Sequence, residues 1–323
     1  MRQHLAILTS GGDAPGMNAC VRAVVRTAAF HGWGVLGIKN GYKGLVEGAY
    51  QPLHLGSVGN IIQRGGTILG SSRCAEFRTK RGREKAYEFL RSHRVNHLIT
   101  LGGDGTFAGA EIFSREFGVR VSGVPCTIDN DLKGTDFSIG FDTAVNTAVQ
   151  CIDRIRDTAD SHGRVFVIEV MGRNTGHLAL ETALAVGAEF VVVPEVKLNL
   201  QSLIKKIQAG IDRGKAGSIV IVAEADEPGR AFPISATIEK KIKRDVRTAI
   251  LGHLQRGGSP SCRDRNLASR LGSSAVEFLI KGKNRFMVGS ISEHVKATAL
   301  TDVVKGRRRA DLNDFKLVNI LSI

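Results

Sequence analysis

Aromatic residues are scarce in this 323-residue chain, which has one Trp and three Tyr. The sequence has no basic stretch interleaved with aromatics of the kind that stacks on nucleobases, so we expect no nucleic-acid partner despite a net charge of +14. No apolar run approaches the roughly 20 residues that cross a bilayer, and the start MRQHLAILTSGG has no small-residue cleavage site. We therefore expect a cytoplasmic protein with no membrane partner.

Cysteines are also few. The five are widely separated, at Cys20, Cys74, Cys126, Cys151 and Cys262. An odd number with no C-x-x-C pair argues against a disulfide framework or a structural zinc site. The excess of basic residues, 45 against 31 acidic ones, suits small phosphorylated ligands as well as nucleic acid. The one dense basic run is Lys305–Arg309, which we interpret as solvated surface.

Short apolar, β-branched runs alternate with amphipathic stretches along most of the chain. Six runs are predicted to be strands, over residues 4–8, 97–101, 119–124, 165–170, 190–193 and 218–223. Helical patterns follow at 17–30 and from near Phe107. Apolar strands separated by helices indicate a parallel sheet that is covered on both faces. We predict a doubly wound α/β fold, in one large or two medium domains.

Three loops that follow predicted strands contain glycine, carboxylate or both. The first, Thr9–Asn18, reads TSGGDAPGMN, and its glycines would let a phosphate approach a helix start; an empty tight turn is the alternative. In the second, Gly102–Thr106, Asp104 would reach phosphate through a hard cation such as Mg²⁺, or would simply cap a helix. The third, Pro125–Asp131, offers two carboxylates, one of which could take a proton from a hydroxyl; turn capping is the alternative.

Basic residues stand near the ends of later strands. They are Arg164, Arg173, Arg247, His253 and Arg256. Guanidiniums at loop ends can bind phosphate with a bidentate fork, although each one alone is more often a surface salt bridge. Together with the three loops they favour a phosphate-binding site. GGDGT also resembles the signature of diacylglycerol, sphingosine and NAD kinases, and this resemblance implies phosphoryl transfer.

The sequence resembles the bacterial ATP-dependent 6-phosphofructokinases. The similarity rests on LTSGGDAPGMN, RGGTILGSSR, GGDGT, TIDND, GTDFSIGFDTA, DRIRDTADSHGR, EVMGR, AEFVVVPE and LGHLQRGGSP, in family order over nearly the whole chain. The resemblance implies two similar doubly wound, Rossmann-like domains with mostly parallel sheets. Residues 1–140 plus 256–305 would bind ATP, and residues 141–255 plus 306–323 would bind the sugar phosphate.

The resemblance also implies the reaction and the residues that perform it. ATP would pass its γ-phosphoryl to the 1-hydroxyl of fructose 6-phosphate in glycolysis, with Mg²⁺ held at Asp104. The implied catalytic residues are Asp129, as general base, with Arg173, Thr127 and Asp131. The implied ATP contacts are Gly12, Arg73, Cys74, Gly103, Asp104, Gly105 and Thr106. The implied sugar-phosphate contacts are Thr127, Ile128, Asp129, Arg164, Met171, Gly172, Arg173, Glu224, Arg247, His253, Leu254, Gln255 and Arg256.

Assembly and regulation are implied in the same way. Arg164 and Arg247 match contacts that reach the sugar phosphate from a neighbouring subunit, usually within a homotetramer. An ADP or phosphoenolpyruvate effector would contact Arg22, Arg26, Arg156, Glu189, Arg213 and Lys215. Leu55 and Ala216 replace other effector contacts found in relatives, so allosteric control stays a hypothesis.

One departure bears on the phosphoryl donor. Gly105 and a non-lysine at 126 are typical of ATP enzymes rather than of pyrophosphate-dependent relatives, yet Cys126 stands where ATP enzymes have Gly. A cysteine beside Thr127 would narrow the phosphate space or expose a thiol. The alternatives are pyrophosphate as donor, a lipid or NAD kinase built around GGDGT, and a catalytically weak nucleotide-binding regulatory paralogue.

Overall fold

The computed structural model describes residues 3–225 and 228–322. The chain forms two compact units: unit 1 is Met1–Ile128, Leu132–Thr143 and Arg256–Arg307, and unit 2 is Asp129–Asp131, Ala144–Gln255 and Arg308–Ile323. The predicted boundaries differ from these by a few residues, and which ligand each unit binds stays a prediction. In the described part of the chain, no helix has the length and apolar character that crossing a membrane requires.

Unit 1 is built on a seven-stranded sheet. Its order is β11 (His294–Ala299), β10 (Phe286–Ile291), β5 (Arg120–Pro125), β4 (Val95–Gly102), β1 (His4–Thr9), β2 (Gly34–Ile38) and β3 (Tyr50–Leu53). The five inner strands are parallel, and β3 and β11 pair antiparallel at the edges. The winding direction reverses between β1 and β4. In open α/β sheets, ligands bind beyond the carboxyl ends of the strands at such a switch point.

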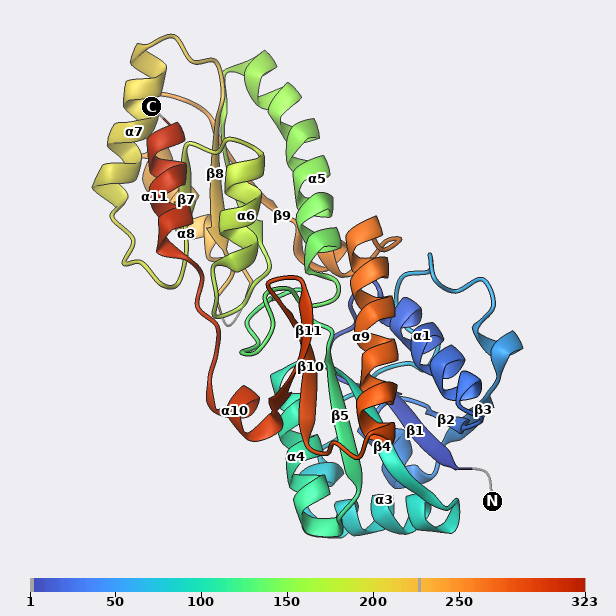
Figure 1. The fold of residues 1–323 in the computed structure, drawn as a ribbon. Helices are drawn as coiled ribbons and strands as arrows, with labels where there is room; N and C mark the ends of the chain where they lie inside the picture. The colour runs from blue at the N-terminus through green and yellow to red at the C-terminus, as the bar shows by residue number, and fades with distance from the viewer. Residues whose placement is uncertain (1–2, 226–227, 323) are drawn as a thin grey trace. The chain divides into compact units, whose positions relative to one another are not determined.

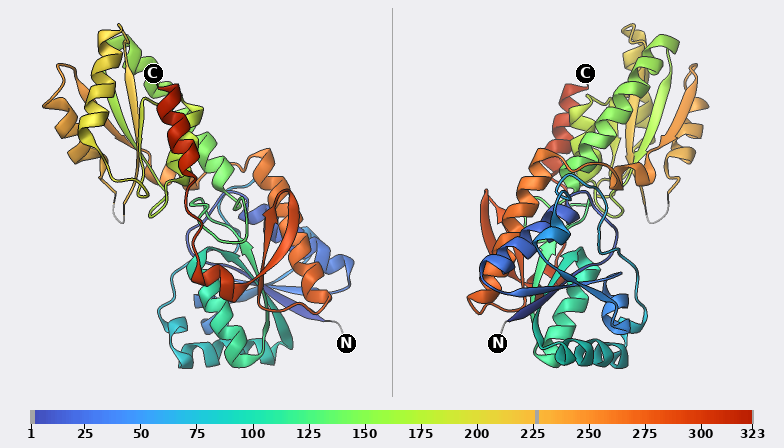
Figure 2. Two further views of the ribbon diagram at one scale, coloured as in Figure 1. Left: turned by 60° about the vertical axis from the view of Figure 1, so that its left-hand side comes forward. Right: turned by 90° about the vertical axis from the view of Figure 1, so that its right-hand side faces the viewer.

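Helices cover both faces of this sheet (Figures 1 and 2). On one face lie α1 (Met17–Phe30) and α9 (Cys262–Ile280), which pack against each other. On the other lie α2 (Tyr42–Glu47), α3 (Lys80–Ser92), α4 (Asp104–Phe117) and α10 (Leu300–Lys305). Of the short 3₁₀ helices, η1 (Leu55–Val58) contacts α1, and η2 (Glu76–Arg78) contacts α2 and α3. Leu98, Phe107 and Phe113 are fully buried in the second layer. Apolar side chains therefore fill both faces of the sheet, as the apolar strands predict.

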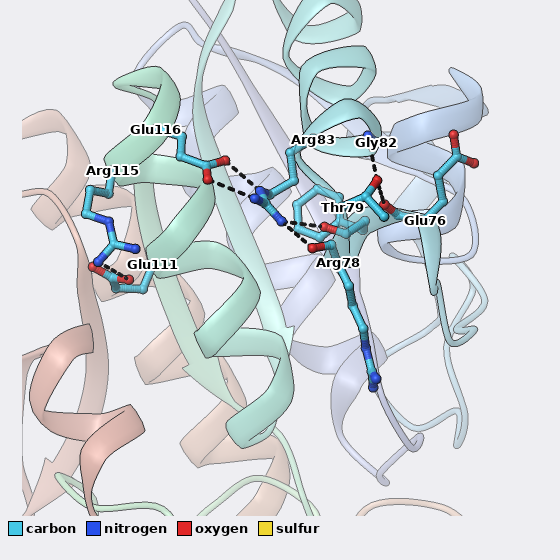
Figure 3. Close-up of polar contacts among 9 residues, drawn as sticks. Glu76, Arg78, Thr79, Gly82, Arg83, Glu111, Arg115 and Glu116 are labelled. Carbon is cyan, nitrogen blue, oxygen red and sulfur yellow. Dashed lines mark hydrogen bonds and ion pairs between the residues drawn. The ribbon is translucent and has the colours of Figure 1, made fainter.

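A buried arginine joins α3 to α4 (Figure 3). Arg83 donates from Nε and Nη2 to the two carboxylate oxygens of Glu116, at 2.6 and 2.8 Å, and its Nη1 donates to the carbonyl oxygens of Phe77 and Arg78. The hydrogen bond from Arg83 lowers the pKa of Glu116. Two of these four hydrogen bonds hold α3 beside the helix that begins at Asp104, and the other two hold it to η2.

Unit 2 contains a four-stranded parallel sheet in the order β7 (Phe190–Val192), β8 (Ser218–Ala223), β6 (Val165–Val170) and β9 (Val246–Ile250). Its helices are α5 (Phe141–His162, which starts in unit 1), α6 (His177–Ala185), α7 (Leu200–Asp212), α8 (Ala231–Glu239) and α11 (Leu312–Leu321); η3 (Gly252–Arg256) follows β9. Leu203 and Ile207 of α7 and Ile234 of α8 pack on Val220 and Val222 of β8. Helix α6 contacts β8 and α11.

The predicted α/β fold with doubly wound, mostly parallel sheets is confirmed, and the two sheets differ in size. The six predicted strands match β1, β4, β5, β6, β7 and β8 within two residues at each end. The helix expected from near Phe107 begins earlier, at Asp104, because Gly103 provides an extended N-cap and a carboxylate suits the first turn of a helix. The hairpin of β10 and β11 and the strands β2, β3 and β9 were not predicted.

Candidate active site

The first candidate loop joins β1 to α1 in unit 1. Gly11 and Gly16 have φ of 88° and 110°, which only glycine adopts easily. The Asn18 side chain donates to the carbonyl oxygens of Arg64 and Gly65, at 3.1 and 3.0 Å, and accepts the Ile68 N–H at 2.8 Å. Asn18 thereby ties the segment RGGTI to the loop. Asn18 was not predicted to have this role, and its only signal in the sequence is its place directly after the glycine-rich turn.

An arginine lies over this loop. A Cβ placed on Gly12 would come within 2.2 Å of Nη1 of Arg256, which also donates to the Asp13 carbonyl oxygen at 3.2 Å. Glycine at position 12 thus lets the guanidinium approach the backbone, and a side chain there would displace the end of Arg256. Arg256, expected among the sugar-phosphate contacts, contacts a loop of unit 1 in this structure.

The second candidate loop follows β4 and leads into α4. The Thr106 hydroxyl donates to the Ser10 carbonyl oxygen at 3.2 Å, and the buried Tyr42 hydroxyl donates to the Thr106 carbonyl oxygen at 2.6 Å. Burial raises the pKa of Tyr42, so it stays a neutral donor. A Cβ on Gly105 would meet no atom within 4 Å, so the space beside this glycine is open. The loops after β1 and β4 are thus bonded at the switch point and leave room for a ligand.

The remaining nucleotide candidates surround these loops. Asp104 is the first residue of α4, and its side chain is 40% exposed. Arg73 is exposed in the segment before η2, and Cys74 is half-buried against the core. Arg307, from the basic run interpreted as solvated surface, is exposed, but its Nη2 also lies 3.6 Å from Oδ2 of Asp104.

The third candidate loop begins in unit 1 with Cys126, Thr127 and Ile128. The Cys126 N–H donates to the Gly102 carbonyl oxygen at 2.9 Å, which ties this loop to the second. The Cys126 thiol is buried and hydrogen-bonds with Cys20 of α1; burial, reinforced by this neighbour, raises its pKa well above the ordinary value. The expectation of an exposed thiol is therefore wrong, because the side chain turns into the core. Ile128 is likewise fully buried.

In unit 2 a threonine joins the two loops that carry the candidate catalytic residues. The Thr175 hydroxyl is placed to donate to the carbonyl oxygens of Asp129 and Gly172, at 3.3 and 3.2 Å. Gly172 and Arg173 both have positive φ, 134° and 52°. Asp129 is half-buried and Arg173 is exposed. A carboxylate and a guanidinium thus stand on backbone segments that are joined by one hydroxyl. Thr175 was not among the residues predicted from the sequence.

The neighbouring candidates lie beyond the carboxyl ends of β6, β8 and β9. The buried Gln255 side chain accepts the Met171 N–H at 3.0 Å, so it positions this loop. The Glu224 N–H donates to the carbonyl oxygen of Val170 at 2.9 Å. His253 and Leu254 are exposed in η3, and the Asp131 carbonyl oxygen accepts the Arg308 N–H at 2.8 Å.

Arg164 and Arg247 occupy the opposite edge of the same sheet. They stand at the amino ends of β6 and β9, where both donate to Oδ2 of Asp245 at 2.8 Å. Strand β6 has six residues, so at about 3.3 Å per residue its two ends are roughly 17–20 Å apart. The two arginines therefore belong to a different edge from Met171–Arg173. Asp245, which joins them, was not among the predicted residues.

Four of the effector candidates lie around the amino ends of β7 and β8. Lys215 pairs with the buried Glu189, which also accepts the Ile219 N–H, and Arg156 donates to the carbonyl oxygen of Val186. Arg213 ends α7. The last two, Arg22 and Arg26, lie on α1 in unit 1.

Asp104 is the predicted ligand of Mg²⁺, and the oxygen atoms available around it decide whether this ion fits. In the parts of the chain that the structure describes, no three His, Cys, Asp or Glu residues gather into a self-sufficient metal site. Asp104 provides one accessible carboxylate beside the open space at Gly105. One carboxylate together with phosphate oxygens is the usual environment of Mg²⁺, so the residues present fit this ion.

These features define a class before any comparison. Glycine-rich and carboxylate-bearing loops beyond the carboxyl ends of parallel strands are the sites at which doubly wound α/β proteins bind phosphorylated ligands. Both units carry such loops.

Comparison with known proteins assigns the chain within this class. The family model described as Phosphofructokinase matches residues 4–279. An ATP-dependent 6-phosphofructokinase from Halothermothrix orenii is 47% identical over 99% of this chain and 100% of its own, and ATP-dependent 6-phosphofructokinase 1 from Thermus thermophilus is 52% identical over 96% of each chain. The solved Pichia pastoris phosphofructokinase in the T-state superposes with a TM-score of 0.89 at 34% identity, covering 94% of this chain.

The chain belongs to the phosphofructokinase family. The predicted resemblance is confirmed, and a lipid or NAD kinase is set aside. The chain spans the whole of the Halothermothrix relative but only 36% of the longer yeast chain.

Proposed function

We propose that this protein is an ATP-dependent 6-phosphofructokinase that works in the cytoplasm. It would transfer the γ-phosphoryl of ATP to the 1-hydroxyl of fructose 6-phosphate, giving fructose 1,6-bisphosphate and ADP in glycolysis. The observation that carries the proposal is the identity of about half with ATP-dependent 6-phosphofructokinases over almost the entire chain. The loop contacts in each unit support it.

The proposed chemistry in unit 2 centres on Asp129. Its carboxylate takes the proton of the sugar 1-hydroxyl, and the Thr175 hydroxyl holds the Asp129 backbone beside the Gly172 loop. Arg173, exposed on that loop, neutralises charge on the transferring phosphoryl. Thr127 and Asp131 flank the base. Met171, Gly172, Glu224, His253, Leu254 and Arg256 bind the sugar phosphate. Ile128, whose side chain is buried, acts through its backbone, and Gln255 acts by positioning the Met171 loop with its side chain.

The proposed nucleotide residues belong to unit 1. Gly12, Arg73, Cys74 and Gly103–Thr106 contact ATP, with the open space at Gly105 receiving phosphate. Asp104 would hold Mg²⁺ together with phosphate oxygens, and the ion supplies charge neutralisation for phosphoryl transfer. Positioning and electrostatics then provide most of the catalysis, since phosphoryl transfer needs little covalent chemistry from the protein.

Assembly is part of the proposal. Arg164 and Arg247 stand at the amino ends of β6 and β9, a strand length away from Met171–Arg173. If they bind the sugar phosphate, they do so in a neighbouring subunit, which makes a homo-oligomer, expected to be a tetramer, a condition of activity. The cluster around Glu189 and Lys215 supports an ADP or phosphoenolpyruvate site.

The decisive experiment exchanges the donor and removes the base. Turnover of fructose 6-phosphate is measured in a coupled assay with MgATP and with pyrophosphate, in wild type, Asp129→Ser and the exposed control Asp153→Ser. We expect turnover with ATP only, a loss of about 10²–10⁴-fold in Asp129→Ser, and no change in the control. Turnover with pyrophosphate instead of ATP would identify pyrophosphate as the phosphoryl donor. Turnover with neither donor would favour the regulatory paralogue. An unaltered rate in Asp129→Ser would show that Asp129 is not the general base.

A further inference from the structure

Arg307 lies where the chain passes the candidate nucleotide loops of unit 1. It follows α10 within the basic run Lys305–Arg309, which the function described above leaves unused. Its backbone forms an isolated antiparallel bridge with Leu132. Its side chain is 52% exposed, and its Nη2 is 3.6 Å from Oδ2 of Asp104. A guanidinium from the C-terminal part of the chain therefore meets the carboxylate of the GGDGT loop.

The backbone, rather than the ion pair, fixes the position of this arginine. The bridge to Leu132 holds residue 307, and a Cβ on the preceding Gly306 would lie 2.9 Å from Cδ of Lys133. Glycine at 306 thus lets the strand-like segment run close to Lys133. A half-exposed pair at 3.6 Å contributes little stability and exchanges partners readily. Arg307 would stay beside Asp104 even if the carboxylate took another partner.

The charges around Asp104 favour an anion. Arg307 brings a positive charge to within 3.6 Å of the Asp104 carboxylate, and the Lys133 side chain lies beside the preceding Gly306. A metal ion alone at Asp104 would face the guanidinium at short range, which is unfavourable. A metal ion that arrives with phosphate oxygens removes this repulsion, because the guanidinium can donate to an oxygen while the carboxylate meets the cation.

We propose that Arg307 is a phosphate-binding residue for the nucleoside triphosphate, and that its guanidinium pairs with Asp104 until the metal–nucleotide complex binds. The inference rests on the proposed function and extends its nucleotide site to the C-terminal basic run. On binding, Asp104 exchanges the guanidinium for the metal, and Arg307 exchanges the carboxylate for phosphate oxygens. No covalent bond changes in this step.

Two other roles for the pair predict different results. In a surface ion pair without function, removing Arg307 changes nothing measurable. If the Arg307 guanidinium instead competes with the metal ion for Asp104, removing Arg307 strengthens nucleotide binding, most of all at low Mg²⁺. Phosphate binding predicts the opposite sign.

The test measures ATP binding to the full-length protein by isothermal titration calorimetry, at saturating Mg²⁺ and without sugar phosphate. We expect Arg307→Ala to weaken ATP binding about tenfold or more, the effect of losing a hydrogen bond between charged groups, and Arg307→Lys to recover part of it. The matched control Arg309→Ala removes an exposed arginine of the same run and is expected to bind ATP like wild type. Unchanged or tighter binding in Arg307→Ala, or an equal loss in Arg309→Ala, would overturn the proposal.

Kinetics separate this inference from the proposed function. Wild-type turnover with ATP tests the function, whereas Arg307 is tested only by the difference between variants. We expect Arg307→Ala to raise KM for ATP and to leave KM for fructose 6-phosphate within twofold. Arg307→Gln, which keeps most of the side-chain volume, repeats the measurement should the alanine variant be less stable. A rise confined to the KM of the sugar would also contradict the assignment.

Discussion

His97 should make the protein less stable in mild acid. The residue lies on β4 and is only 6% exposed, with its ring 4.8 Å from that of Trp33. Its Nδ1 has no hydrogen-bond partner among the residues that the structure describes. Burial, with a smaller contribution from Arg120, lowers the pKa of His97 from 6.5 to about 4.

The sign and size follow from these values. Between pH 6.5 and about 4 the unfolded chain binds a proton that the folded chain does not, so stability falls as the pH falls through this window. With these two pKa values, the loss in the free energy of unfolding is about 2 kcal/mol at pH 5, and the full shift corresponds to about 3 kcal/mol. Water penetration and local relaxation reduce these values, so we expect a loss of about 1 kcal/mol between pH 7 and pH 5.

Urea denaturation at pH 7, 6 and 5 measures this effect. His97→Phe should lose less stability on acidification than wild type, by about 1 kcal/mol, whatever its stability at pH 7. The exposed control His294→Phe should follow the wild-type pH dependence. Parallel curves for wild type and His97→Phe would refute the reasoning, because the difference between them isolates one imidazole.

Three further outcomes are expected. Arg83→Met should lower the free energy of unfolding by about 1–2 kcal/mol in urea denaturation, because it leaves the half-exposed Glu116 carboxylate and two carbonyl oxygens without their donor. The control Arg115→Met, which removes an exposed ion pair, should change it by less than about 0.5 kcal/mol. Cys126→Gly should keep ATP-dependent turnover within twofold or raise it, since the thiol faces the core, and a large loss would assign the thiol a function. Asp245→Asn should raise KM for fructose 6-phosphate about 3- to 10-fold with kcat nearly unchanged, because the two arginines that it orients would bind substrate without reacting; an unchanged KM would contradict that role.

The local pattern of apolar residues in the sequence was sufficient to predict much of the fold. Strands such as Val165–Val170 and Ser218–Ala223 are predominantly apolar, β-branched runs, and their burial favours a strand inside a parallel sheet. Strands β2 and β9 carry weaker signals. GVLGI is interrupted by glycine, and β9 reads VRTAI, with only one buried position. Their pairing is decided by neighbours distant in the sequence.

The candidate loops were also readable from sequence, because a parallel sheet sends the loops after its strands to one edge. The loops after β1 and β4 proved to be bonded to each other through Thr106 and Ser10. Sequence spacing alone could not identify Asn18, Thr175 or Asp245. Each acts through a side chain that reaches a segment many residues away, and such a contact leaves no periodic signal.

The sequence by itself determined the fold class, the loops that carry the chemistry and the family, because these depend on residue type and order. Only the tertiary structure decided the direction of individual side chains. It turned Cys126 into the core, placed Arg164 and Arg247 at the opposite strand ends from Met171–Arg173, and brought Arg307 to Asp104. The physical reason is that a strand fixes which residues lie at each of its ends, whereas the partner of a side chain depends on which distant segments pack beside it.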